Sequence, residues 1–248
     1  MIEAAENNGE LTKNKIILEA TSGNTGIGLA LVGAIKGYKV VLTMSAAMSE
    51  ERKTMLKAFG AEIVETDPTK GTDGAIIKAR EIYQENPEKY WMSNQFANKH
   101  NPLVHYHKTA DEVINQVPEI TTFVAGMGTS GTLMGISERL KEHNSEIKIV
   151  GAEPELGHKI QGLKNMKEAI VPEIYKEHKL DHKVVVKTED AYETARQLAI
   201  KEGLFVGMSS GAAMFAALKT AEEMQEGTMV VLLPDRGEKY LSTALFKF

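Results

Sequence analysis

The stretch that decides the fold is KIILEATSGNTGIGLALVGAIKG, residues 15–37. Its first part is rich in isoleucine and leucine and favours a strand, whereas residues 24–36 favour a helix that Gly37 ends. A glycine-rich turn, TSGNTG, joins the two. Because strand, tight turn and helix in this order form the repeating unit of a parallel sheet, the segment predicts an α/β fold.

The same alternation continues along the chain. Strands are expected at YKVVLTM, AEIVET, TTFVAG, IKIVGAEP, VVVKT and TMVVLLP. Helices are expected over residues 49–59, 103–116, 130–143, 190–202 and 209–224, DPTKGTDG is expected to be a turn, and residues 157–183 a functional loop. We therefore predict two lobes, each with a mostly parallel sheet flanked by helices: a smaller one over residues 1–105 and a larger one over residues 106–248.

Composition excludes several classes of protein. The net charge of -5 and the lack of a basic tract give a nucleic-acid backbone no electrostatic attraction, so no nucleic-acid partner is expected. The 248 residues include no cysteine, which excludes disulfides and thiolate chemistry. The longest apolar run, residues 27–35, is too short to cross a bilayer, and MIEAAENNGE has no signal-peptide character. No membrane association is expected, and the predicted location is the cytoplasm.

Three turns carry glycine together with small polar residues. They are TSGNTG at 21–26, GMGTSGT at 126–132 and GMSSGA at 207–212, and each opens a predicted helix. The N–H groups of a helix start attract anions, and loops that follow parallel strands can converge on one crevice. A single such turn is as readily an ordinary helix cap. The three together indicate one ligand with several contacts.

The kind of ligand follows from what these turns lack. GMGTSGT matches neither the dinucleotide fingerprint nor the P-loop, and the strand YKVVLTM ends without the acidic residue that would bind an NAD ribose. A cofactor with a single phosphate, together with an amino-acid substrate whose carboxylate needs its own N–H pocket, accounts for the turns better.

Seven motifs then resemble one family in the right order along the whole chain. They are EATSGNTGIGLA, MSEERKTMLKAFGAEIV, NQFANKHNP, GMGTSGTLMG, EPELGHKIQGL, VGMSSGAA and PDRGEKYLST. Together they resemble the cysteine synthase (O-acetylserine sulfhydrylase) family of pyridoxal-phosphate enzymes, whose fold is of the tryptophan-synthase-β type. The resemblance implies pyridoxal 5′-phosphate as cofactor, an activated serine and sulfide as substrates, and a homodimer.

The resemblance also implies roles for individual residues. The loop that binds the substrate carboxylate would consist of Thr21, Ser22, Gly23, Asn24 and Thr25, with Gln95 as a further contact and Asn24 also touching the cofactor ring. The cofactor phosphate would be held by Gly128, Thr129, Ser130, Gly131 and Thr132. Ser209, or as second choice Ser210, would bond the pyridine nitrogen. A hydroxyl there makes the ring a milder electron sink than a carboxylate would, which suits β-replacement.

One family feature is missing from the sequence. The Schiff-base lysine of the family lies in a segment resembling NPxxSxKDR, which this chain does not contain, and neither Lys13 nor Lys15 lies where it could substitute. No catalytic residue is therefore identifiable, and the fold is predicted to be N-terminally truncated. The expected function is cysteine synthesis from an O-acetylated or O-phosphorylated serine. The alternatives are a catalytically silent fragment that binds cofactor or amino acid, a cystathionine β-synthase, a serine dehydratase, or a domain with an unrelated phosphate ligand.

Two further features receive structural interpretations. His105 and His107 would face apart on a helix, so no metal site is predicted there. The charged run Glu50, Glu51, Arg52 and Lys53 is interpreted as a solvated helix face.

Overall fold

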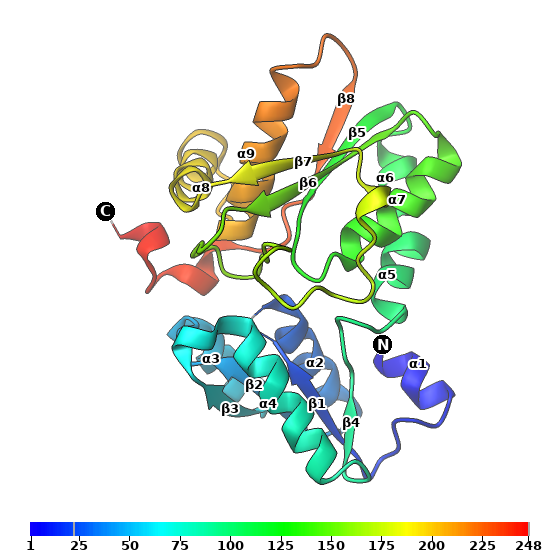
Figure 1. Cartoon of the computed structure of the whole chain (residues 1–248), viewed down its shortest axis with the longest axis vertical. Coiled ribbons are helices and arrows are strands. Elements are labelled where there is room, and N and C mark those ends of the chain that lie inside the picture. The colour runs from blue at the N-terminus through cyan, green and yellow to red at the C-terminus, as the bar shows by residue number, and fades with distance from the viewer. Residues whose placement is uncertain (22, 248) are drawn as a thin grey trace. The chain divides into compact units, whose positions relative to one another are not determined.

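The computed structural model describes residues 1–21 and 23–247. It divides into two compact units, Met1–Asn98 and Lys99–Phe248. Figure 1 shows that each unit has its own sheet with helices packed beside it. The fold class predicted from the sequence, two α/β lobes with parallel sheets, is confirmed.

The first unit is built around a four-stranded sheet in the order β3-β2-β1-β4, with every pair parallel. Its strands are β1 (Ile16–Ala20), β2 (Val40–Ser45), β3 (Glu62–Thr66) and β4 (Tyr90–Met92). Its helices are α1 (Ile2–Asn7), α2 (Asn24–Lys36), α3 (Glu50–Ala58), the 3-10 turn Pro68–Lys70 and α4 (Gly71–Glu85).

Both faces of this sheet are covered. Ile17, Leu42 and Met44 belong to a core with Leu29 of α2 and Leu56 of α3. On the other face, the Thr43 hydroxyl donates to the carbonyl of Ala75 in α4. Successive residues of a strand point to opposite faces, which is why a continuous apolar run such as IIL in β1 is needed here.

The second unit repeats this arrangement with the strand order β7-β6-β5-β8, again all parallel. Its strands are β5 (Ile120–Gly126), β6 (Lys148–Pro154), β7 (His182–Val186) and β8 (Thr228–Val231). Its helices are α5 (His100–Val104), a π-helical segment (His105–Thr109), α6 (Ala110–Gln116), α7 (Gly131–His143), α8 (Thr188–Glu202), α9 (Met208–Ala221) and the 3-10 turns Glu177–Lys179, Gly237–Tyr240 and Ala244–Phe246.

Alternate residues of this sheet serve two cores. Val124 and Val150 pack with α8 and α9, whereas Phe123 and Ile149 pack with α7. The helices therefore form two layers around the sheet, as Figure 1 shows for α8 and α9 on one side and α7 on the other. This is the doubly wound arrangement of α/β proteins.

The order of strands identifies the edge at which each unit can bind a ligand. In the first unit the chain passes from β1 to β2 on one side, and β4 returns to the other side of β1. In the second unit β5 is flanked in the same way by β6 and β8. Such a switch point leaves a crevice at the carboxyl ends of the two strands, where open α/β sheets bind their ligands.

The structure differs from the expected elements in the middle of the chain. The segment taken as the turn DPTKGTDG already contains the start of α4, and β4 was not expected from the sequence. The helix expected from residue 103 begins at His100, since proline is tolerated in a first helical turn. Along the chain, the first compact unit ends at Asn98 and the second begins at Lys99, whereas the boundary expected from the sequence lies after residue 105.

The charged run in α3 is a second difference. Arg52 is only 1% exposed and Lys53 is also buried, so the interpretation as a solvated helix face was wrong for these two residues. The Lys53 ammonium donates to the carbonyl of Ala46 at 3.0 Å and forms ion pairs with Glu50 and Glu65. Arg52 likewise contacts the loop after β2, through the sulfur of Met48. Among the described helices, none combines the length and the apolar character that a bilayer span requires.

Candidate active site

The turn after β1 is organised by a buried threonine. Thr21 Oγ1 accepts hydrogen bonds from the N–H groups of Gly23 at 3.2 Å and Gly26 at 3.1 Å. It thereby satisfies two donors at the start of α2, which have no partner within the helix. Thr21 shapes the loop that the resemblance assigns to the substrate carboxylate. Ser22 of the same loop lies outside the described residues.

Gln95 reaches this loop from the segment that follows β4, the neighbouring strand at the switch point. The Thr25 hydroxyl donates to Gln95 Oε1 at 2.6 Å, and Gln95 Nε2 donates to the carbonyl of Ala20 at 2.8 Å. The structure thus brings together Thr21, Gly23, Asn24, Thr25 and Gln95, which are distant in the sequence, at the carboxyl ends of β1 and β4.

A buried carboxylate lies directly beneath these residues. Glu19 Oε2 accepts hydrogen bonds from the Ser93 hydroxyl and from the N–H of Gln95, and Oε1 accepts one from the N–H of Ala20. Burial raises the pKa of Glu19 to about 7, and the donors from Ser93, Gln95 and Ala20 only partly oppose that rise. Sequence analysis missed this residue, although an acidic residue inside an apolar strand was a signal.

We predict that Glu19→Gln flattens the dependence of stability on pH. The folded-state pKa of Glu19 is about 7, above the ordinary value of 4.5, so ionisation of Glu19 destabilises the folded state. This destabilisation is absent below pH 4.5 and complete above about pH 7. Relative to Glu19→Gln, the wild type should lose about 3 kcal/mol of unfolding free energy over this window. Urea unfolding at about pH 5 and pH 8 measures the unfolding free energy of both proteins. An equal change in unfolding free energy between the two pH values in wild type and Glu19→Gln would contradict the prediction.

The turn after β5 is the candidate phosphate site of the second unit. Ser130 adopts φ 68° at the position preceding α7, and its hydroxyl is buried without a hydrogen-bond partner among the described residues. Ser130 is 3% exposed. A buried polar atom without a partner is costly, and the first N–H groups of α7 likewise lack partners within the helix. An anion at this helix start would satisfy both.

Side chains from the preceding helix support this turn. Asn101 Nδ2 donates to Thr129 Oγ1 at 3.1 Å, and His105 Nε2 lies 3.3 Å from Thr132 Oγ1. Burial lowers the pKa of His105, so its ring is neutral at pH 7. His105 belongs to the π-helical segment, a geometry found often at functional sites. Sequence analysis missed both supporting residues; Asn101 was part of a recognised motif, and His105 had been considered only as a metal ligand.

Backbone approaches the same turn from the loop after β6. The N–H of Lys164 donates to the carbonyl of Met127 at 2.7 Å. A Cβ on Gly128 would lie 2.6 Å from the carbonyl oxygen of Gly162, which is closer than such atoms can approach. Glycine is therefore required at 128 by the close packing of two backbone segments.

The start of α9 carries the residues expected to meet a cofactor ring. The Ser210 hydroxyl donates to the carbonyl of Asp235 at 3.2 Å, and the Tyr240 hydroxyl donates to the Asp235 carboxylate. Ser209 is also buried. Since Asp235 follows β8, the structure places the starts of α7 and α9 and the loop after β8 around the switch point of this sheet.

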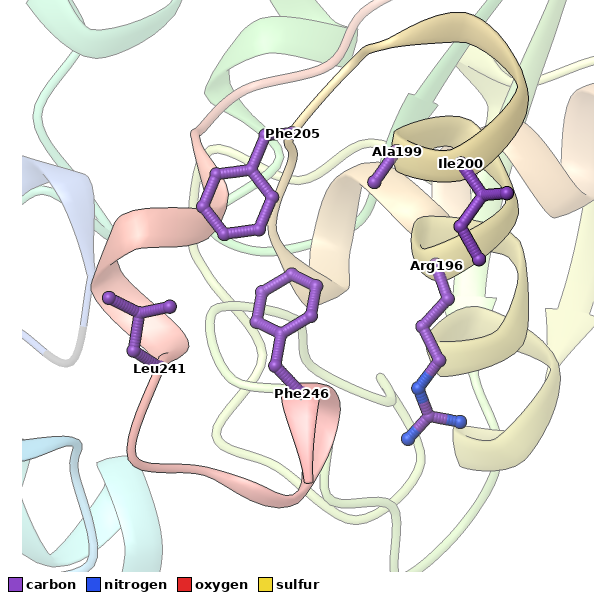
Figure 2. Close-up of a pocket in the computed structure, with 6 residues that line it drawn as sticks. All are labelled: Arg196, Ala199, Ile200, Phe205, Leu241 and Phe246. Atoms are coloured by element: carbon purple, nitrogen blue, oxygen red, sulfur yellow. The ribbon is translucent and has the colours of Figure 1, made fainter. Parts of the chain in front are cut away.

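An apolar pocket elsewhere in the second unit is not part of this site. Figure 2 shows that it lies between α8 and the C-terminal 3-10 turns and that Ala199, Ile200, Phe205, Leu241 and Phe246 line it with Arg196. The Arg196 guanidinium donates to the carbonyls of Leu245 and Ala244. The lining offers hydrophobic contact and no titratable group besides this arginine.

Comparison with known proteins assigns the fold. The family model described as pyridoxal-phosphate dependent enzyme matches residues 1–235. The chain belongs to this family. It is 49% identical over 244 residues to a cysteine synthase of Aquifex aeolicus, covering 96% of this chain and 75% of the relative.

Solved structures agree with the family assignment. A crystal structure of cysteine synthase from Entamoeba histolytica matches with a TM-score of 0.88 and 41% identity, covering 100% of this chain and 76% of the other. An O-ureido-L-serine synthase matches with a TM-score of 0.91 and 36% identity, covering 99% of this chain and 80% of the other. The chain is therefore a cysteine-synthase-like member of the pyridoxal-phosphate-dependent enzymes, and the cofactor predicted from the sequence is confirmed.

Proposed function

We propose that this protein makes cysteine from an O-activated serine and sulfide. The observation that carries the proposal is the buried hydroxyl of Ser130 at the start of α7, which has no hydrogen-bond partner among the described residues, in a chain whose family uses a phosphate-bearing cofactor. The residues around it fit that phosphate. Gly128 permits the backbone of Gly162 to pack closely against the turn. Thr129 and Thr132 are held by Asn101 and His105.

Each unit carries its own set of candidate residues. In the first, the loop Thr21–Thr25 with Gln95 would bind the carboxylate of the amino acid. In the second, the loop Gly128–Thr132 would hold the phosphate and Ser209 would bond the pyridine nitrogen. Ser209 is favoured over Ser210 because the Ser210 hydroxyl is already engaged by Asp235. When bound, pyridoxal phosphate supplies an electron sink for the carbanion formed at the α-carbon.

A hydroxyl partner at the pyridine nitrogen fits replacement at the β-carbon. Ser209 would hold the pyridine nitrogen less firmly protonated than a carboxylate would, and the bound cofactor would then supply a milder electron sink. The resemblance assigns removal of the α-proton to the lysine of the segment resembling NPxxSxKDR, and the proposed reaction requires such a lysine. A homodimer and a cytoplasmic location remain predictions.

The proposal predicts a difference between this chain and a chain that also carries the lysine. We expect the 248-residue chain to bind pyridoxal phosphate reversibly and to yield no lysine adduct after borohydride reduction. Fusing it to a segment that carries the lysine motif of the family, resembling NPxxSxKDR, should give an adduct, and cysteine should form from O-acetylserine and sulfide. Peptide mapping by mass spectrometry and a cysteine assay measure the two results.

Other products would favour the other functions. Cystathionine formed only with homocysteine would indicate a cystathionine β-synthase, and pyruvate formed without a nucleophile would indicate a serine dehydratase. A fused chain that carries the adduct and turns over none of these substrates would support the silent-binding alternative. Lysine-linked cofactor and cysteine formation in the unfused chain would show that our assignment of the lysine is wrong.

A further inference from the structure

Glu19 places an ionisable side chain in the apolar interior of the first unit. It lies at the end of β1, between apolar residues, and is 1% exposed. Its carboxylate receives three hydrogen bonds, two of them from residues that follow β4. A buried ionisable group costs stability, and departures of this kind from an apolar core occur most often where they serve function.

The two donors from the segment after β4 flank a strained residue. Asn94 adopts φ 47°, which is uncommon for a residue other than glycine, and it lies between Ser93 and Gln95. Ser93 Oγ and the N–H of Gln95 both donate to the same oxygen, Oε2 of Glu19. The carboxylate therefore spans Asn94 and holds this sharp corner in place. Such backbone conformations persist only where their surroundings fix them.

The corner in turn fixes the side chain of Gln95. With its backbone tied to Glu19, Gln95 directs its amide to the carbonyl of Ala20 and to the hydroxyl of Thr25. Gln95 is thus held at its N–H by one residue of β1 and at its side chain by the loop that follows β1. An apolar residue at 19 would leave the N–H of Gln95 and the Ser93 hydroxyl without their acceptor.

We propose that Glu19 is a positioning residue for the substrate carboxylate, which acts by holding the Ser93–Gln95 corner against the Thr21–Thr25 loop. The inference rests on the proposed function, because it assumes that this loop and Gln95 bind the amino-acid carboxylate. Glu19 itself does not touch the substrate. Glu19 contributes to the geometry of Gln95. Loss of Glu19 therefore weakens the binding of ligands that carry the carboxylate and leaves the binding of ligands that lack it unchanged.

The test compares two stable cofactor adducts that differ only in that carboxylate. The probes are N-(5′-phosphopyridoxyl)-L-serine and N-(5′-phosphopyridoxyl)ethanolamine, and calorimetry measures the dissociation constant of each for the full chain. The readout is the dissociation constant of the ethanolamine adduct divided by that of the serine adduct, which is large when the carboxylate is bound. We expect Glu19→Met to reduce this ratio by about tenfold, because the N–H of Gln95 and the Ser93 hydroxyl both lose the acceptor that fixes the side chain of Gln95. Glu19→Gln keeps an acceptor for Gln95 and should rescue most of the ratio.

Two further variants separate positioning from folding. Ser93→Ala removes one of the bonds to Glu19 without touching the carboxylate and should reduce the ratio by about threefold. It keeps the proposal testable if Glu19→Met fails to fold. The matched control is Glu153→Met in β6, which removes a buried glutamate that accepts the N–H of Met166 at 3.0 Å. This control should lower stability and leave the ratio unchanged.

The outcomes distinguish the inference from the function on which it rests. An unchanged ratio in Glu19→Met and Ser93→Ala would overturn the inference while leaving the proposed function intact. An equally large decrease of the ratio in Glu153→Met would also overturn the inference, because general destabilisation would then explain the effect. A wild-type chain that binds both adducts equally, or neither, would overturn the proposed function together with the inference.

Discussion

Replacing Gly128 by alanine is expected to weaken the binding of pyridoxamine 5′-phosphate by roughly 100-fold, the scale of effect that a 1 Å misplacement in a site can produce. The added Cβ would lie 2.6 Å from the carbonyl oxygen of Gly162. A rotamer change cannot relieve this contact, because the obstructing atom belongs to the backbone. We expect the turn from Gly126 to Ser130 to move, and it carries the hydroxyl and the helix start that we assign to the phosphate.

Calorimetric titration with pyridoxamine 5′-phosphate measures this loss without requiring the missing lysine. The matched control is Gly28→Ala in α2, where nothing lies within 4 Å of the new Cβ. That variant should bind like the wild type and gain about 0.5–1 kcal/mol of stability, since alanine is the better helix former. Wild-type affinity in Gly128→Ala would show that the phosphate binds elsewhere.

Gly135→Ala should have the largest effect on stability, lowering the free energy of unfolding by about 3 kcal/mol. Its Cβ would lie 2.1 Å from the carbonyl oxygen of Pro102 and 2.9 Å from the backbone nitrogen of Tyr106. α7 would have to separate from α5 and from the π-helical segment, and the contact between His105 and Thr132 would be lost with it. Urea unfolding monitored by circular dichroism measures the change.

The outcome also distinguishes close packing from helix propensity. Alanine in place of glycine within an otherwise unobstructed helix is stabilising, as we expect for Gly28. Opposite signs for the two substitutions would identify the Pro102 contact as the cause. A stability of Gly135→Ala equal to or above that of the wild type would show that α7 can shift without cost.

Local signals in the sequence predicted some elements fully. The helix expected over residues 24–36 is observed with those bounds, and it ends because Gly37 adopts φ 74°. Helix α7 and strands β1 and β5 were likewise found within one or two residues of their expected positions. In these segments, apolar periodicity and the flanking glycines agree, so the neighbourhood of each residue in the chain suffices.

Other elements could not be predicted from neighbouring residues in the sequence alone. Helix α4 starts inside a segment with two glycines, Gly71 and Gly74, and its helical state depends on packing against β1 and β2. Strand β4 has only three residues and is stabilised by its pairing with β1. The burial of Arg52 and Lys53 is also a tertiary effect, because helical spacing alone cannot say which face of α3 the rest of the unit covers.

By itself, the sequence determined the α/β class, the three glycine-rich turns, the family and its cofactor, because those depend on residue order and on motifs of adjacent residues. Only the tertiary structure decided which turns share a switch point. It placed β4 beside β1, and so Gln95 beside Thr25, and it placed the loop after β8, with Asp235, beside Ser210. It also showed that Glu19 is buried and accepts hydrogen bonds from Ala20, Ser93 and Gln95. These contacts join residues as far as 76 positions apart, and strand pairing between distant segments has no signature in either segment alone.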